Sequence, residues 1–419
     1  MHYMIRIGGI LIPATFPEVR TTVMNIKASL AQDARDVRLD LFLGIANWFL
    51  FLDHIPDNVV SSFTMRNFGF SGASDAFVFI IGYTASLTYA SIMLERGTLV
   101  GVTRVFKRAW QLYAAYIVLF AIYIVTIGDV AARYAAPDIF YEFNITGLVD
   151  QPIRIISHGL LLQSRVLNLD VLQLCILLMG CFPVVLWMML RKPGLTMAGS
   201  IVLYFAARTF DWNLSSYPDG VWYFNPFCWQ LLFVFGAWCA LEAARKSWSF
   251  LKSPIPVYLG IAYLIFALVM TMAGRFPEFG AMFPHWLVDV FNPNDRTNLA
   301  PYRVLHLVVV VFLAARFMPK DWRGLQWPIF QPLIICGQQA LSVFCVGVFL
   351  SFACRLALMT SSGSLTAQIS VSALGMAIMT LVACYISWSK RQDHPAAGRA
   401  LRNPPVKVAD RTLLAGDPG

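Results

Sequence analysis

Ten long apolar segments constrain the fold of this chain more than any other feature of its sequence. The segments lie at 40–55, 74–94, 109–129, 169–190, 194–209, 226–243, 254–273, 302–317, 331–356 and 367–388. A helix of about 20 apolar residues crosses the hydrocarbon layer of a bilayer, and most of these segments are of that order. Charged residues make up only 13% of the chain, against roughly 25% in soluble domains. The sequence therefore predicts an all-α, polytopic membrane protein with about ten transmembrane helices.

The basic residues predict the orientation of these helices. Most of the 32 lysine and arginine residues, including every lysine, fall in alternate connections and in the two terminal segments. Basic connections stay on the cytoplasmic side, so both termini are expected there. The same distribution accounts for the net charge of +9 without a nucleic-acid partner. We expect a cytoplasmic leader at 1–34, a membrane domain at 35–391 and a disordered cytoplasmic tail at 392–419.

The three longest connections fall on the opposite, outer side, at roughly 130–168, 210–225 and 274–301. Loops of this length on a compact bundle usually serve binding or catalysis. The second loop contains Trp222 and Asn225 among other aromatic and amide side chains. This composition is typical of a surface that stacks on sugar rings and binds their hydroxyl groups, and equally of an aromatic belt at a helix start.

Several chemical classes are excluded by missing patterns. The eight cysteines lie within or beside apolar segments, with no CxxC pair and no His/Cys metal spacing, so no metal site is expected. The motifs of serine hydrolases and P-loop ATPases are missing too. His306, about a turn inside the eighth segment, belongs either to a polar pathway or to a helix–helix hydrogen bond. His158 is interpreted as structural.

The first membrane segment ends on an acid and a histidine. Asp53 and His54 precede Pro56, and ionisable groups at such a depth are costly unless they face a wet cavity. His54 is therefore a candidate general base for a hydroxyl group; the alternative is an interfacial histidine bonded to a backbone carbonyl. Asp53 cannot face the same way as its neighbour on a helix. Asp75, at the start of the next segment, is expected to orient the imidazole.

Charged residues also mark the cytoplasmic mouth of this first segment. Arg35, Arg38 and Asp40 lie there, where the simplest interpretation is ordinary helix-end charges and positive-inside anchors. The functional alternative is that Arg35 and Arg38, with Lys107 and Arg108, bind the phosphates of a cytosolic cofactor.

Two sequence blocks, RLDLFLGIANWFLFLDHIPD (38–57) and FTMRNFGFSGASDAFVFIIGYTASLTYA (63–90), resemble the OpgC family, which is named for succinylation of osmoregulated periplasmic glucans. The resemblance extends from Arg35 to Arg391 and includes RTNLAPYRVLH (296–306) and CGQQALSVFCVGVFLSF (336–352). The wider superfamily is the type 3 membrane acyltransferases. The resemblance implies about ten helices and transfer of an acyl group from a cytosolic coenzyme A thioester to a sugar outside.

The superfamily pattern of the first two helices fits this chain with two departures. The matching residues are Leu39, Asp40, Gly44, His54, Phe77, Phe79 and Gly82. Leu43 stands where an arginine is usual, and Ile81 where a serine is usual. Histidine is also expected more often where this chain has Gln339. The resemblance implies that His54 is the catalytic base. If the missing arginine helps to bind the donor, this chain uses Arg38 or Arg35 instead, binds its donor weakly, or has lost activity.

We therefore expect an O-acyltransferase of the bacterial inner membrane that uses acyl-CoA, specifically succinyl-CoA, to modify periplasmic glucans. His54, oriented by Asp75, would activate a sugar hydroxyl, and an outside arginine would bind the free carboxylate of a succinyl group. The sugar would be positioned by Asn168, Asp170, Trp222, Asn225 and Asn298. The alternative is a membrane transporter or accessory scaffold that keeps the fold without the chemistry, and Leu43 and Ile81 favour it.

Overall fold

The computed structural model describes residues 4–7, 10–13, 36–134, 151–164, 166, 168–217, 219–242, 253–320, 322–360 and 363–393. All ten apolar segments form helices, which confirms the predicted all-α fold of this part of the chain. The helices are α2 (Val37–Asp53), α3 (Ala73–Arg96), α4 (Thr98–Tyr134), α7 (Asp170–Arg191), α8 (Pro193–Thr209), α9 (Pro226–Glu242), α10 (Ile255–Arg275), α13 (Pro301–Phe317), α14 (Gln331–Gln338) followed by α15 (Ala340–Thr360), and α16 (Leu365–Asp393). Near the N-terminus, β1 (Met4–Ile7) and β2 (Ile10–Pro13) pair as a short antiparallel hairpin within the predicted leader.

Six helices in the described residues are long and apolar enough to cross a membrane, namely α3, α4, α7, α10, α15 and α16. By the length and composition of these helices the chain is a membrane protein. The helices α2, α8, α9 and α13 contain 17 residues each, or about 26 Å at the usual helical rise. A total of ten crossings and a cytoplasmic position for both termini stay predictions.

Helix α2 packs against α14 through two reciprocal glycine contacts. A Cβ atom on Gly44 would overlap the carbonyl group of Leu333, and one on Gly337 would overlap the carbonyl group of Asp40. The same arrangement joins α3 to α9 at Gly82 against Phe233 and at Gly236 against Phe79. Small residues let helix backbones approach closely in membrane bundles. These contacts fix α2 and α3, two of the helices with candidate site residues, within the bundle.

The ninth apolar segment, expected as one helix over 331–356, is divided into α14 and α15 at Gln339. The side chain of Gln339 explains the position of this break. Its Nε2 donates to Ser387 Oγ over 3.1 Å, and its Oε1 accepts from Lys390 Nζ over 2.7 Å. Both partners belong to α16, so Gln339 ties the break to the last helix of the chain.

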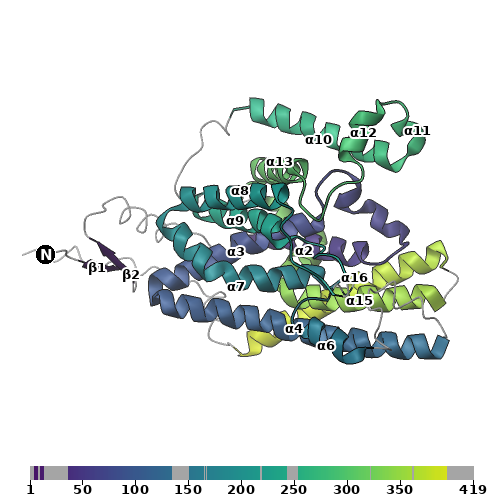
Figure 1. Ribbon diagram of the computed structural model, residues 1–419, viewed down its shortest axis with the longest axis horizontal. Coiled ribbons are helices and arrows are strands. Elements are labelled where there is room, and N and C mark those ends of the chain that lie inside the picture. Colours follow the sequence, from purple (N-terminus) through teal and green to yellow (C-terminus); the bar gives the residue numbers. More distant parts are fainter. Residues whose placement is uncertain are drawn as a thin grey trace, which may run out of the picture.

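The outer connections contain short helices, which the sequence did not predict. They are the 3-10 helices η1 (Val59–Phe63) and η2 (Met65–Asn67), then α6 (Pro152–Leu160), α11 (Pro277–Gly280) and α12 (His285–Phe291). Two more 3-10 helices, η4 (Arg323–Gln326) and η5 (Pro328–Phe330), precede α14. Helices α10, α11 and α12 lie together along one edge of the molecule, at the top of Figure 1. Phe70 joins them to the rest, because its ring stacks on Phe291 at 4.9 Å and meets Tyr302 edge-on.

Candidate functional site

His54 is the residue at which α2 ends. Its backbone N–H donates to the carbonyl of Leu50 over 3.1 Å, which completes the last turn of the helix. The side chain is half-buried, and its Nδ1 is buried without a hydrogen-bond partner among the described residues. The imidazole is therefore held by packing rather than by an acid.

Asp53 faces a different set of groups from His54, as expected for neighbours on a helix. Its Oδ1 accepts from Thr64 Oγ1 over 2.5 Å and lies 3.3 Å from Arg66 Nε. The charge of Arg296 also acts on this carboxylate. Arg66 acts electrostatically on His54 as well. Arg66 thus lies against the end of α2.

Asn168 lies beside His54. Its Nδ2 is 3.4 Å from the His54 carbonyl oxygen and 3.4 Å from Ser351 Oγ, both as acceptors. Asn168 has a φ of +72°, a left-handed conformation that asparagine tolerates better than most residues. The structure therefore brings one predicted substrate residue to the histidine, and Asp170 follows two residues later as the first residue of α7.

The contacts of Asp75 differ from the pair with His54 that we expected. Its Oδ2 lies 2.6 Å from Arg303 Nη2 and accepts from the Gly72 N–H over 2.8 Å, and both charged side chains are buried. The expected pair of Asp75 with His54 is therefore replaced by an ion pair between the start of α3 and α13. The physical reason is that a buried arginine needs a carboxylate more than a neutral imidazole does.

His306 adds a second contact between the same elements. Its Nδ1 lies 2.7 Å from Ser71 Oγ, and both residues are buried. Of the two interpretations of His306, this contact fits a hydrogen bond between a helix and the segment that precedes α3. His158 also has a structural contact, because its ring stacks on Tyr217 with a centroid distance of 4.2 Å.

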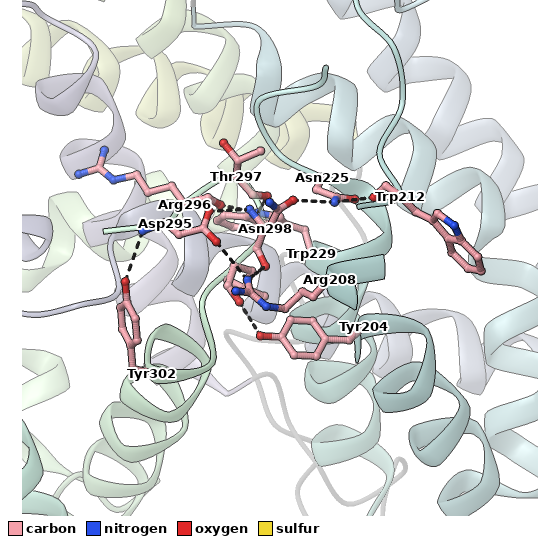
Figure 2. A network of polar contacts seen from close by, with 11 residues as sticks. Tyr204, Arg208, Trp212, Asn225, Trp229, Asp295, Arg296, Thr297, Asn298 and Tyr302 are labelled. Atoms are coloured by element: carbon pink, nitrogen blue, oxygen red, sulfur yellow. Dashed lines mark hydrogen bonds and ion pairs between the residues drawn. The ribbon is translucent and has the colours of Figure 1, made fainter. Parts of the chain in front are cut away.

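A polar network holds the outer loops together, as Figure 2 shows. Asn225 Nδ2 donates to Asn298 Oδ1 over 2.8 Å and to the Trp212 carbonyl over 2.7 Å. Arg208 Nη1 donates to the Asn298 carbonyl over 2.6 Å and lies 3.1 Å from Asp295 Oδ2. Asn225 and Asn298, which we expected to bind sugar, thus bind protein groups here, and their sugar contact stays a prediction.

The aromatic residues of the second outer loop divide into buried and exposed ones. Trp222, the predicted sugar-stacking residue, is buried, with 6% of its surface exposed. Trp212 is 48% exposed, and Phe210 stacks on it with a centroid distance of 5.7 Å. The exposed pair is therefore better placed than Trp222 to contact a sugar. The sequence shows aromatic residues at both places and does not distinguish them, because exposure depends on how the loop folds.

A cavity of about 520 Å³ runs through the bundle between α2, α3, α4, α7 and α15. Arg104, Lys107 and Arg108 of α4 line one end of it. On α3 the lining residues run from Phe77 to Ile92, about 22 Å of helix. The cationic end lies toward the junction of α3 and α4, on the side that the basic residues predict to be cytoplasmic.

The other end of the cavity lies among residues of α2, α3, α7 and α15. Phe77 and Phe344 line this end and stack with a centroid distance of 5.2 Å. Leu172 of α7 lines it too, one helical turn beyond Asn168, the neighbour of His54. The cavity therefore extends from a basic rim to a point one helical turn from Asn168 on the α7 side, whereas on α2 its lining ends at Leu43, about 16 Å of helix before His54.

Leu43 and Ile81, where the acyltransferase pattern has arginine and serine, both line this cavity. Asn47 and His54 lie on the same side of α2 as Leu43, at helical spacing. This side of the helix is therefore polar from Asn47 to the end of the helix. Both side-chain amide atoms of Asn47 are buried without partners in the described part of the chain. Asn47 was not among the residues predicted from the sequence, although a lone amide within an apolar segment is a signal that could have identified it.

The residues expected at the cytoplasmic mouth of α2 lie apart from the cavity lining. Arg38 Nε and Nη2 donate to Asp36 over 3.0 and 2.7 Å, and Nη1 donates to the Met318 carbonyl. Burial acts to raise the pKa of Asp36, but the hydrogen bonds and charge of Arg38 lower it overall. Asp40 is buried, with its carbonyl against Gly337. Arg35 lies outside the described residues.

Nothing in the described residues forms a cluster of three or more His, Cys, Asp or Glu side chains that could hold a metal ion. One family model, described as OpgC protein, matches residues 35–391. No curated protein matches the chain. No solved structure matches it either. The matched residues include His54, the cavity and the outer-loop network.

Proposed function

Because the chain belongs to the OpgC family, we propose that it is an inner-membrane O-acyltransferase that transfers a succinyl group from cytosolic acyl-CoA to hydroxyl groups of periplasmic glucans. Membership of this family indicates a transferase that modifies glucans. The identity of the donor, the identity of the acyl group and the direction of transfer across the membrane are our proposals beyond family membership.

The cavity is the observation that carries this proposal. Its rim holds three cations, Arg104, Lys107 and Arg108, which match the phosphate groups of a coenzyme A. Its walls are mainly apolar, as suits the pantetheine arm. A donor bound in this way directs its thioester toward His54. We therefore propose that residues of α4 bind the phosphate groups in place of Arg35 and Arg38. Lys107 and Arg108 of this helix were already candidates.

His54 serves as the general base in this mechanism. The imidazole takes a proton from a sugar hydroxyl, the oxygen attacks the thioester carbonyl, and an ester bond forms as the carbon–sulfur bond breaks. The coenzyme A thiolate leaves and takes the proton from the imidazolium. Nδ1 of His54 has no acid partner among the described residues. Asn168 is therefore the residue that positions this end of α2, through its bond to the His54 carbonyl.

Leu43 and Ile81 fit this mechanism as apolar wall residues. Both line the cavity beside Phe77 and Leu172, so the wall at this depth suits the alkyl segments of the donor arm. The alternative function, a transporter or scaffold, rests on these same two substitutions. A cavity that keeps a basic rim and an apolar wall favours the enzyme.

The proposal is tested by the charge of glucans from a deletion strain complemented with variants. We expect His54→Ala to remove the anionic acyl groups while glucan abundance stays normal, as mass spectrometry of extracted glucans would show. His285→Ala is the matched control, because His285 is an exposed residue of α12. Unchanged acylation in the His54 variant would disprove the mechanism. Glucans missing from the periplasm of the deletion strain would favour the transporter.

A further inference from the structure

The side-chain amide of Asn47 carries an inference that rests on the proposed function. We infer that Asn47 binds an amide group in the pantetheine arm of the acyl-CoA donor, between the cavity and His54. The arm has one amide near its sulfur and another nearer its phosphates, and the one nearer the phosphates is the group that Asn47 binds. Asn47 is then a residue that positions the donor, while His54 stays the general base.

Asn47 is buried in a way that leaves both ends of its amide without a partner. Only 1% of the residue is exposed. Neither its Nδ2 nor its Oδ1 has a hydrogen-bond partner within the residues that the structure describes. Buried amides are normally paired, because an unpaired buried polar group is costly. A ligand that satisfies Asn47 accepts a hydrogen bond from Nδ2 and donates one to Oδ1.

Asn47 lies on the side of α2 that leads from the cavity to His54. Leu43, one helical turn earlier, lines the cavity. Successive residues turn by about 100°, so Asn47 is about 40° round the helix from Leu43 and about 20° from His54. Side chains of an α-helix tilt toward its N-terminus, so the amide of Asn47 leans toward the level of Leu43. It is therefore the first polar side chain of α2 beyond the end of the cavity.

An amide group of the ligand satisfies both atoms of Asn47 at once. Its carbonyl accepts from Nδ2 and its N–H donates to Oδ1, whereas a thioester carbonyl only accepts. The phosphate groups of the donor have their own partners at the basic rim, in Arg104, Lys107 and Arg108. A sugar hydroxyl also donates and accepts, but in the proposed function the sugar reaches His54 from the opposite, outer side.

The length of the arm fits this position. Asn47 precedes His54 by seven residues, which is about 10 Å along a helix. In coenzyme A, seven bonds separate the sulfur from the nitrogen of the amide nearer the phosphates, and an extended chain spans them in about 8 Å. With the sulfur at His54, this amide comes to the level of Asn47. The amide near the sulfur is only three bonds away, about 4 Å, and stops short of it.

Binding of the arm also involves a change in packing. The lining of the cavity on α2 ends at Leu43, so an arm that extends to His54 separates the side chains packed around Asn47. The hydrogen bonds that Asn47 gains exist only in the bound state, and they offset part of the cost of this opening.

Two competing roles for Asn47 predict different results. As a ligand of the oxyanion, Asn47 would donate to the thioester carbonyl during transfer, and its loss would slow transfer without weakening the binding of free coenzyme A. As a purely structural residue, it would affect neither. Free coenzyme A has the arm but no acyl group, so its binding distinguishes the three roles.

The test measures the binding of two probes to the purified full-length protein by calorimetry. One probe is free coenzyme A, and the other is adenosine bisphosphate, which has phosphate groups but no arm. We expect Asn47→Ala and Asn47→Leu each to weaken coenzyme A binding by roughly tenfold or more, because the amide of the arm is left unpaired. Binding of adenosine bisphosphate should stay within about twofold. Arg108→Gln, at the basic rim, should weaken the binding of both probes.

Two further variants complete the comparison. Asn47→Gln keeps an amide on a longer side chain and should bind coenzyme A more tightly than Asn47→Ala. Gln326→Leu is the matched control, because Gln326 is an exposed amide of η4 and does not line the cavity. Melting temperatures without ligand verify that each variant is folded. Since alanine empties the position and leucine fills it, an effect of packing alone would differ between these two variants.

Each outcome decides the question. Unchanged coenzyme A binding in both Asn47 variants overturns the inference, and slow succinyl transfer together with that result would assign Asn47 to the oxyanion. Equal weakening of both probes overturns it too, because the effect then does not come from the arm. If the unsubstituted protein binds coenzyme A through Asn47 but acylates no glucan, the proposed function fails and this binding site stands. If it binds no coenzyme A, both fail.

Discussion

Asn47 and Asn168 are both buried asparagines near the cavity, but they have opposite hydrogen-bonding states. Neither side-chain atom of the Asn47 amide has a partner in the described chain, whereas Asn168 donates to the His54 carbonyl and to Ser351. A buried polar group without a partner costs about 1–3 kcal/mol. The helix face that leads to His54 is therefore kept polar at a cost in stability.

We expect Asn47→Leu to raise the free energy of unfolding by about 1 kcal/mol, because leucine fills a similar volume without unpaired polar atoms. Thermal unfolding of the purified protein in detergent would measure the change. Asn168→Leu is the opposing comparison and should lower stability, since it loses two hydrogen bonds and places a branched side chain at a φ of +72°. A lower melting temperature for Asn47→Leu would show that its amide has a partner after all.

The buried pair of Asp75 and Arg303 gives a second prediction at this scale. Removing one member leaves an uncompensated buried charge, so Asp75→Asn should lower stability by about 3–5 kcal/mol. The double variant Asp75→Leu/Arg303→Met should lose less than the single variant. Detergent melting curves of the three proteins would test this. If Asp75→Asn were fully stable but slow in acyl transfer, Asp75 would orient the base, as the sequence had predicted.

At the scale of elements, the contact between α2 and α14 depends on backbone approach. We expect Gly337→Val to separate the two helices at the Asp40 carbonyl and to lower stability by about 1–3 kcal/mol or more. Gly199→Ala in α8 is the control, because a Cβ atom there meets nothing within 4 Å. Alanine at that position should be neutral or slightly stabilising. Equal melting temperatures for the two variants would contradict the close contact.

The sequence predicted the helices better than it predicted their pairing. The apolar segments locate each helix, because hydropathy over about 20 residues is a local property. The break at Gln339 was not predicted from the sequence, because the residues on both sides are apolar and the hydrogen bonds that hold the break involve residues of α16. The pair of Asp75 with Arg303 was missed for the same reason, because 228 positions separate its two members.

At the scale of the whole molecule, the cavity was the least predictable feature of the candidate site. Lys107 and Arg108 were recognised as possible phosphate ligands, but the sequence favoured Arg35, Arg38 and Asp40 as the donor-binding residues. The ranking depends on which helix faces enclose the space, and five helices contribute to it. His54 was identified because an acid and a histidine at the end of an apolar helix stand out without knowledge of any partner.

The glycine contacts between α2 and α14 also have a consequence for how the protein is made. Gly44 and Leu333 are about 290 residues apart in the chain, which a ribosome adds in roughly 15 to 60 s. Helix α2 is the first long helix to be synthesised in the described chain, yet its partner arrives during the last third of translation. Throughout this interval the polar groups of Asp40 and Asn47 lack their final protein surroundings. The nascent protein therefore holds its first long helix without this packing partner until α14 has been synthesised.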